Sequence, residues 1–252
     1  RQLAAAFWPG PLTMVVPKQS SIPDLVTAGL PSVAIRVPQH PVFRTILKRL
    51  DFPLAAPSAN PFGYVSPTRA CHVAHTLGSR IQAVLDGGAC DFGLESTIVD
   101  LRNPQVPTIL RHGPITQAQI NQILQVEVTT HSGASNDTAP QSAPGLMTKH
   151  YSPKAQVTLL PHGETLTTNA TPESGIALVS NQKPTWHTNQ ANIFWLSETG
   201  ELNEIAHNLF ELIQRLDQQG YQQLRIELAA EEGIGKAIND RLRRAAAKCE
   251  AE

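Results

Sequence analysis

Cysteine, aromatic residues and charge are all scarce in this sequence of 252 residues. Its three cysteines, Cys71, Cys90 and Cys249, cannot all pair and fit no disulfide framework, so we expect a reducing, cytoplasmic location. Aromatic residues make up 5% and charged residues 16%, and no run of 18 apolar residues encodes a membrane span. Proline is common (20 residues) and 41% of the chain is hydrophobic, which excludes a coiled coil, a collagen-like repeat and a wholly disordered chain.

The first residues contain neither a Met nor a signal-peptide pattern. The stretch RQLAAAFW (1–8) instead reads as the end of an amphipathic helix. We therefore expect a chain that is truncated at its N-terminus.

Charge is distributed unequally along the sequence. Residues 1–125 hold 10 Lys and Arg against 6 Asp and Glu, a net charge of +4, and residues 126–252 hold 10 against 15, a net charge of −5. A stretch rich in Ser, Thr, Ala, Gly and Pro lies between these halves and has the composition of a linker. We expect a first domain over 1–128, a linker over 129–153 and an accessory domain over 154–252, with an anionic ligand on the first.

Both expected domains mix helices and strands. The first reads as an open twisted sheet, whereas the second resembles a small α/β sandwich in which Gly220 ends the longer helix. The expected strands cover 12–16, 32–37, 54–56, 83–86, 96–100, 108–111, 157–160, 175–179, 193–196 and 224–228. The expected helices cover 42–49, 66–77 (with Ser66 as N-cap), 116–124 (capped by Thr116), 204–219 and 235–248.

Three familiar kinds of catalytic or cofactor site are disfavoured. The stretch 232–236 departs from a phosphate-binding loop, because Ala230 and Ala237 stand where that motif needs Gly and Ser or Thr. His72 and His75, next to Cys71 in one expected helix, have no second Cys/His pair at zinc-finger spacing. The sequence contains no G-x-S-x-G elbow, and nothing local activates Cys90, so a covalent nucleophile is not expected.

Polar residues follow several expected strands. Arg36 lies within an apolar stretch, where it should meet an anionic ligand or a structural carboxylate, and Arg111 ends another strand just before Gly113. Hydroxyl and amide side chains occur at Ser58, at Asn60 and within 66–68 and 96–97. They could bind phosphate or substrate, or they could only cap helices and form turns. The pattern favours a site that binds and orients an anionic small molecule.

The order of these segments is similar to a known family. FWPGPLT (7–13), VAIRVP (33–38), APSAN (56–60) with SPT (66–68), LDGG (85–88), GLESTIVDL (93–101) and RHGP (111–114) resemble the YrdC-type domain of threonylcarbamoyl-AMP synthases. APGLMTKHYSP (143–153) and EEGIGKAINDRLRRAA (231–246) resemble the linker and last helix of that enzyme's long form. The resemblance implies an α/β chain, with a YrdC-type open twisted mixed sheet and concave ligand site followed by a smaller Rossmann-like domain.

The resemblance also implies a reaction and site residues. Such enzymes join L-threonine, bicarbonate and ATP into threonylcarbamoyl-adenylate and pyrophosphate, with Mg²⁺ carried by the ATP. A separate tRNA threonylcarbamoyl transferase complex takes up the product to make N6-threonylcarbamoyladenosine at position 37 of tRNA. The implied threonine contacts are Arg36, Ser58 and Ser96. The implied ATP contacts are Ser32, Asn60, Thr68, Arg111, His150 and Tyr151, with the order of importance of the last two left open.

One part of the family's pattern has no counterpart in residues 1–252, namely the opening strands with a Lys-x-Arg phosphate-binding motif. We therefore expect the chain by itself to be inactive or nearly so. Two alternatives to the synthase are an RNA-binding or ribosome-associated module and a carbamoyl-transferase relative with another acceptor. The near-zero net charge and the lack of interleaved aromatic and basic residues disfavour the first alternative, and the linker and second domain disfavour the second.

Overall fold

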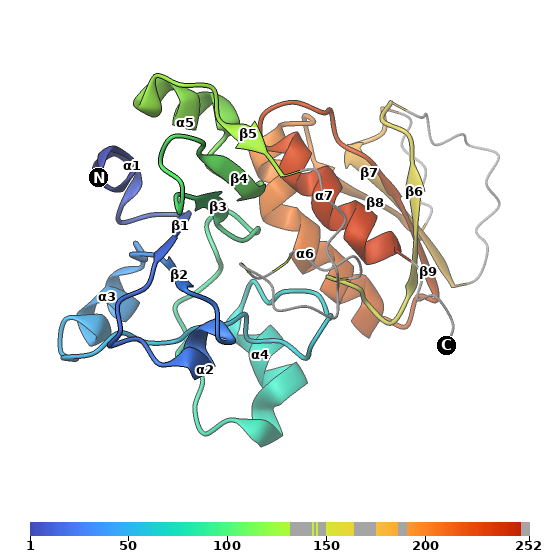
Figure 1. Cartoon of the computed structure of the whole chain (residues 1–252). Helices are drawn as coiled ribbons and strands as arrows, with labels where there is room; N and C mark the ends of the chain where they lie inside the picture. The colour runs from blue at the N-terminus through green and yellow to red at the C-terminus, as the bar shows by residue number, and fades with distance from the viewer. Residues whose placement is uncertain (132–142, 144, 146–149, 164–174, 186–190, 248–252) are drawn as a thin grey trace. The chain divides into compact units, whose positions relative to one another are not determined.

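The protein is described by a computed structural model that covers residues 1–131, 143, 145, 150–163, 175–185 and 191–247 (Figure 1). Two compact units make up the chain: a first unit of Arg1–Pro57 with Glu95–Thr148, and a second unit of Ser58–Leu94 with Lys149–Glu252. Within the described residues no helix is long and apolar enough to cross a membrane.

The first unit is built on a five-stranded mixed sheet in the order β2-β1-β3-β4-β5. Its strands are β1 (Leu12–Pro17), β2 (Ser32–Ile35), β3 (Thr97–Asp100), β4 (Thr108–Arg111) and β5 (Thr129–Thr130). β1 runs antiparallel to β2 and parallel to β3, whereas β3 and β4 are antiparallel. The expected open mixed sheet is therefore confirmed, although Thr129 and Thr130 pair with β4 at its edge rather than opening the linker.

Helices cover one face of this sheet. Leu3 of α1 (Gln2–Phe7) and Ile120 of α5 (Gln117–Leu124) are fully or almost fully buried against strand residues such as Val99. Thr116 caps α5 as expected, because its hydroxyl accepts the Gln119 backbone N–H in a capping box. Two further helices, α2 (Asp24–Thr27) and α3 (Pro41–Leu47), flank β2 in the sequence.

The second unit contains a four-stranded parallel sheet in the order β6-β9-β7-β8. Its strands are β6 (Gln156–Leu160), β7 (Ile176–Gln182), β8 (Ile193–Ser197) and β9 (Gln223–Glu227). Helices α6 (Leu202–Gln218) and α7 (Gly235–Ala246) pack on it through a common core (Figure 1). In α6, Ile205, Leu209, Leu212, Ile213 and Leu216 are all buried, so the apolar spacing in the sequence predicted this packing face correctly.

Residues 58–94, hereafter segment 58–94, belong to this second unit, although they precede β3 of the first. The segment holds α4 (Ala70–Leu77) and the 3₁₀ turn η1 (Gly78–Arg80). Val65 is 1% exposed within the core of the second unit, and Tyr64 and Leu94 pack against the same core. This division differs from the expected domains 1–128 and 154–252, because helix α6 supplies the packing partners of the segment.

Three local expectations in segments 54–56, 66–77 and 83–86 are wrong. Residues 54–56 and 83–86 form no strand. The helix expected from Ser66 begins only at Ala70, and Ser66 does not cap it. The carbonyl of Ser66 instead accepts a hydrogen bond from Gln214 of α6, and the Thr68 backbone N–H donates to the ring of His72 in α4, so both groups are bound to side chains.

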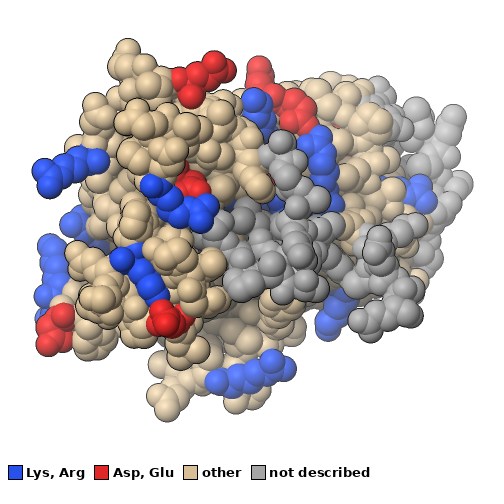
Figure 2. Space-filling model, viewed as in Figure 1, with Lys and Arg blue, Asp and Glu red and all other residues tan. Residues whose placement is uncertain are grey.

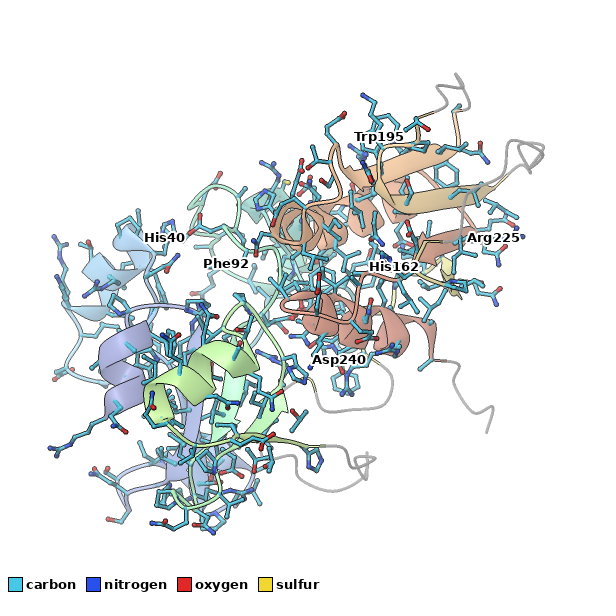
Figure 3. The ribbon with its side chains drawn as sticks, turned by 90° about the horizontal axis from the view of Figure 1, so that it is seen from above. His40, Phe92, His162, Trp195, Arg225 and Asp240 are labelled. Carbon is cyan, nitrogen blue, oxygen red and sulfur yellow. The ribbon has the colours of Figure 1, made fainter. Side chains whose placement is uncertain are left out.

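A glycine marks the closest approach of segment 58–94 to α6. Gly93 has φ +68°, and a Cβ there would lie 2.4 Å from the carbonyl oxygens of both Ala206 and His207. Phe92, which precedes it, is labelled in Figure 3. Only glycine meets both requirements, because an added Cβ would strain the backbone and collide with the helix.

Replacing Gly93 with Ala should therefore destabilise the second unit by about 3 kcal/mol, measured by urea unfolding, through backbone strain plus a steric clash. Gly88→Ala is the matched control, because Gly88 has φ +85° but nothing within 4 Å of an added Cβ. It should cost only about 1 kcal/mol. Equal losses for the two variants would contradict the close packing of Gly93 on α6.

Candidate functional site

Strand register brings two arginines to one end of the first sheet. Met14 pairs with Ile35, so Arg36 continues β2 at the end where β1 begins. Leu12 pairs with Thr97 at the start of β3, and Ile98 pairs with Arg111 at the end of β4. Arg36 and Arg111 therefore reach the same end of the sheet on either side of β1 and β3.

A buried cluster occupies this end of the sheet. The Ser96 hydroxyl lies 2.7 Å from that of Thr13 and accepts a hydrogen bond from Arg111 Nη2 at 3.2 Å. Arg111 Nε and Nη2 also donate to the Ser96 carbonyl, at 3.2 and 3.0 Å. Ser96 is 5% and Arg111 7% exposed. The guanidinium thus fixes the position of the Ser96 hydroxyl, leaving its proton for Thr13 or a ligand.

Arg36 is more accessible than the cluster around Ser96. It follows the last residue of β2, is exposed to solvent, and donates from Nε to the Gly10 carbonyl at 3.0 Å. This bond orients the guanidinium at the sheet end while its solvent-exposed position suits a bidentate contact with a carboxylate.

Two other residues of the first unit lie differently from what the sequence suggested. Ser32 pairs with Pro17 at the opposite end of β1 and β2, so the structure does not bring it to Arg36. Its buried hydroxyl has no hydrogen-bond partner among the described residues. A Cβ on Gly113 would lie 2.4 Å from the Thr97 backbone nitrogen, so this glycine allows a close approach to the start of β3.

The remaining expected site residues belong to the second unit. Ser58 is exposed, and its carbonyl accepts the Asn60 backbone N–H at 3.0 Å. The Asn60 amide donates to the carbonyls of Pro61 and Tyr64, at 2.9 and 3.1 Å. Its buried Oδ1 has no partner within the described part of the chain, and is therefore an acceptor that a ligand amine or hydroxyl could use.

Thr68 is 5% exposed and is held by two residues that sequence reasoning did not select. Its hydroxyl donates to Glu211 Oε2 at 3.0 Å, and its backbone N–H donates to His72 Nδ1 at 3.2 Å. Since a backbone N–H can only donate, His72 Nδ1 must be unprotonated in this arrangement. The other ring nitrogen, Nε2, lies 3.5 Å from Glu211 Oε2. The four-residue spacing of Thr68 and His72 is the sequence signal that could have indicated their contact. Their partner Glu211 lies 143 residues from Thr68, and no local pattern connects it to them.

His150 and Tyr151 sit in different surroundings. Tyr151 is 1% exposed and stacks on Phe210, with ring centroids 5.5 Å apart. The guanidinium of Arg241, on α7 beside Asp240 (Figure 3), lies 5.4 Å from its ring centroid. His150 is only partly buried and packs edge-on against Tyr151, at 4.1 Å. His150 is therefore the more accessible of the two to a ligand, whereas Tyr151 belongs to the core.

The described residues hold no group of three or more His, Cys, Asp or Glu that could bind a metal ion. Cys71 and Cys90 are exposed free thiols, and Cys249 lies outside the described residues. A cavity of about 560 Å³ lies beside β6 and the end of α7, and none of the expected site residues lines it. On the face shown in Figure 2, the Lys and Arg side chains are spread out and several lie beside carboxylates, rather than forming one basic patch.

Known proteins resemble both halves of the chain. Residues 1–113 match the family described as telomere recombination, and residues 115–247 match the threonylcarbamoyl-AMP synthase C-terminal domain. The chain is 36% identical over 252 residues to the threonylcarbamoyl-AMP synthase of Pyrococcus abyssi, and 31% identical over 252 residues to that of Bacillus subtilis. These matches cover 96% and 98% of this chain, and 72% of each relative.

This chain belongs to the threonylcarbamoyl-AMP synthase family. Two solved structures of Sua5 from P. abyssi share its fold, each at 32% identity over 97% of this chain and 72% of that one. The form complexed with L-threonine superposes with a TM-score of 0.82. A variant with a histidine and the following tyrosine replaced by alanine superposes with 0.85.

The family boundary near residue 114 of this threonylcarbamoyl-AMP synthase homologue does not coincide with the packing boundary. Segment 58–94 lies in the N-terminal family domain by sequence but in the second unit by packing. The two-domain family and the mixed α/β fold expected from the sequence are thus both confirmed, whereas the roles of the individual site residues stay predictions.

His72 gives the second unit a dependence on pH. Its pKa is lowered, mainly by burial and further by the positive charge of Arg69, although Glu211 acts in the opposite direction. The second ring of α4, His75, also lowers it. Below about pH 6.5 the unfolded chain therefore binds a proton that the folded chain excludes, and the free energy of unfolding falls as pH decreases.

His72→Gln should flatten this fall in stability below pH 6.5, measured by urea unfolding at a series of pH values. His75→Gln is the matched control, because His75 is exposed on the same helix. It should leave most of the pH dependence in place. A slope that disappears with His75→Gln but survives His72→Gln would contradict the assignment.

Proposed function

We propose that this chain is an L-threonylcarbamoyladenylate synthase that uses L-threonine, bicarbonate and ATP and releases pyrophosphate. The observation that supports this most strongly is the sheet end to which strand register brings both Arg36, just after β2, and the Arg111-bound hydroxyl of Ser96, just before β3. A guanidinium next to fixed hydroxyls can hold an amino acid by its carboxylate and side-chain hydroxyl. The P. abyssi Sua5 structure complexed with L-threonine supports this choice of ligand.

The proposed chemistry needs positioning rather than a side-chain nucleophile. The threonine amine attacks the carbon of bicarbonate, and loss of water leaves a carbamate. A carbamate oxygen then attacks the α-phosphate of ATP, and pyrophosphate leaves. In this scheme Arg36, Ser58 and Ser96 hold threonine so that its amine is presented to the carbon, which lowers the entropic cost of the encounter.

We assign ATP contacts to Ser32, Asn60, Thr68, Arg111, His150 and Tyr151. The unpartnered Oδ1 of Asn60 favours its assignment, whereas the burial of Tyr151 makes His150 the better direct contact of the pair. Since the described residues provide no metal cluster, we propose that Mg²⁺ accompanies the ATP phosphates and is not held by a protein site.

The product would serve N6-threonylcarbamoyladenosine formation at position 37 of tRNA, through a separate threonylcarbamoyl transferase complex in the cytoplasm. The net charge of −1 favours this indirect route over direct RNA binding, which is typical of strongly basic domains.

The decisive assay is pyrophosphate release that depends on ATP, L-threonine and bicarbonate together. It should be run on this chain and on the chain extended at its N-terminus by a Lys-x-Arg-containing segment of the family. We expect pyrophosphate release only when all three substrates are present. If the extended form released pyrophosphate no faster with threonine than without it, the proposed function would be wrong.

Arg36→Ala in the active form should raise KM for L-threonine about tenfold or more, because a charge-assisted hydrogen-bonding partner of the carboxylate is lost. KM for ATP should change little. Arg49→Ala, which removes an exposed arginine that is not among the expected site residues, serves as the control and should leave both constants unchanged. An unchanged KM for threonine in Arg36→Ala would refute the role of Arg36.

A further inference from the structure

One face of helix α6 carries a row of polar side chains that all bind segment 58–94. His207, Glu211, Gln214 and Asp217 follow one another at intervals of four, three and three residues, which places them along one stripe of the helix. The described residues of both partners lie within the second unit. By sequence, however, α6 belongs to the C-terminal family domain and segment 58–94 to the N-terminal one.

The end of the stripe fixes the start of the segment. Asp217 Oδ2 accepts a 2.6 Å hydrogen bond from the Tyr64 hydroxyl, and its Oδ1 accepts the Ala155 backbone N–H at 2.9 Å. Burial, and then the hydrogen bond to Asp217, raise the pKa of Tyr64, so its hydroxyl keeps the proton that it donates. One turn earlier, Gln214 is 1% exposed and donates to the Ser66 carbonyl at 2.8 Å.

The middle of the stripe fixes the residues around Thr68. Glu211 Oε2 accepts hydrogen bonds from the Thr68 hydroxyl and from Arg69 Nε, both at 3.0 Å, and faces His72 Nε2 at 3.5 Å. A single carboxylate oxygen thus orients a hydroxyl, a guanidinium and an imidazole. The pair with Arg69 is half-exposed and adds little by itself, so the value of Glu211 lies in orientation.

The beginning of the stripe fixes the end of the segment. His207 Nδ1 lies 2.9 Å from the Asp91 carbonyl, and the Cβ-free surface of Gly93 packs on the carbonyls of Ala206 and His207. Apolar burial provides the contact area between segment 58–94 and α6, but the hydrophobic effect has no preferred direction and does not select one register. The directional bonds of the stripe are what set the register of the segment along the helix.

We propose that α6 positions the nucleotide-binding segment of the enzyme, and that Glu211 is the positioning residue for Thr68. This inference rests on the proposed function, in which Asn60 and Thr68 contact ATP. The C-terminal domain then has a defined role, because its helix α6 fixes the positions of residues that bind ATP. Glu211 acts through Thr68, Arg69 and His72 and does not itself contact the substrates.

The test compares ligand affinities of Glu211→Ala, Glu211→Gln and the wild type by calorimetry, in both forms of the protein used for the activity assay. ATP should bind about tenfold more weakly to Glu211→Ala, because Thr68 and Arg69 lose their common acceptor. L-Threonine should bind within twofold of the wild type, since two of its three proposed contacts, Arg36 and Ser96, lie in the other unit. The third, Ser58, lies ten residues before Thr68 at the start of segment 58–94. Glu211→Gln keeps an acceptor oxygen and should recover part of the ATP affinity.

Gln218→Ala, an exposed position on the same helix, is the control and should bind both ligands normally. Two results would overturn the positioning role and leave the proposed function intact. One is unchanged ATP affinity in Glu211→Ala. The other is that both Glu211→Ala and Glu211→Gln lose affinity for ATP and for threonine to the same extent. A wild type that binds threonine and not ATP in either form would instead overturn the proposed function and this inference with it. If Glu211→Ala fails to fold, Glu211→Gln still decides, because a selective loss of ATP affinity supports the proposal and no loss contradicts it.

Discussion

The hydrogen bonding between α6 and segment 58–94 is the constraint on which the arrangement of the second unit depends. It joins parts of the chain up to 153 residues apart, as in the bond between Tyr64 and Asp217. Because the bonded groups include the almost fully buried Gln214 and the largely buried Thr68, leaving either without its partner would carry the desolvation cost of an unsatisfied polar group. The segment therefore has one register on α6, and α4 and the loops on either side of it take their places from that register.

The first unit places its expected site residues by a different route, which is mainly strand register. A mixed sheet in which β1 is antiparallel to β2 and parallel to β3 places the end of β2 beside the beginnings of β1 and β3. Arg36 and Ser96 are then neighbours of the same sheet end, although they are 60 residues apart in the sequence. A one-residue slip of either pairing would send these side chains to the other face, so the site is as well defined as the sheet.

The sequence predicted those parts of the structure whose cause is local. The apolar spacing of α6, the Thr116 cap of α5 and the bounds of β4 all follow from residues within or next to each element. The order of elements indicated an open sheet, and the charge distribution and linker composition indicated two domains. The family resemblance implied the same organisation, which the structure and the relatives confirm. Register then explains why Arg36, Ser96 and Arg111 come together and why Ser32 does not.

What the sequence did not reveal depends on contacts between distant residues. Ser66-Pro67-Thr68 has the local signs of a helix start, yet the helix begins at Ala70, and the Ser66 carbonyl instead accepts a hydrogen bond from Gln214, 148 residues away. By its sequence context His72 is an ordinary helix residue, and Glu211 is one of several polar residues on an amphipathic helix. The expected domain boundary at 128 failed to anticipate the packing of segment 58–94 for the same reason.

Native-state hydrogen exchange tests the central claim most directly, because it reports which amides open together. The amides of α4 in segment 58–94, followed at increasing low concentrations of denaturant, should share the opening free energy and denaturant dependence of the amides of α6. Such a result would show that segment 58–94 and α6 are one cooperative unit. Exchange of the α4 amides together with those of β1 and β3, independently of α6, would contradict the account.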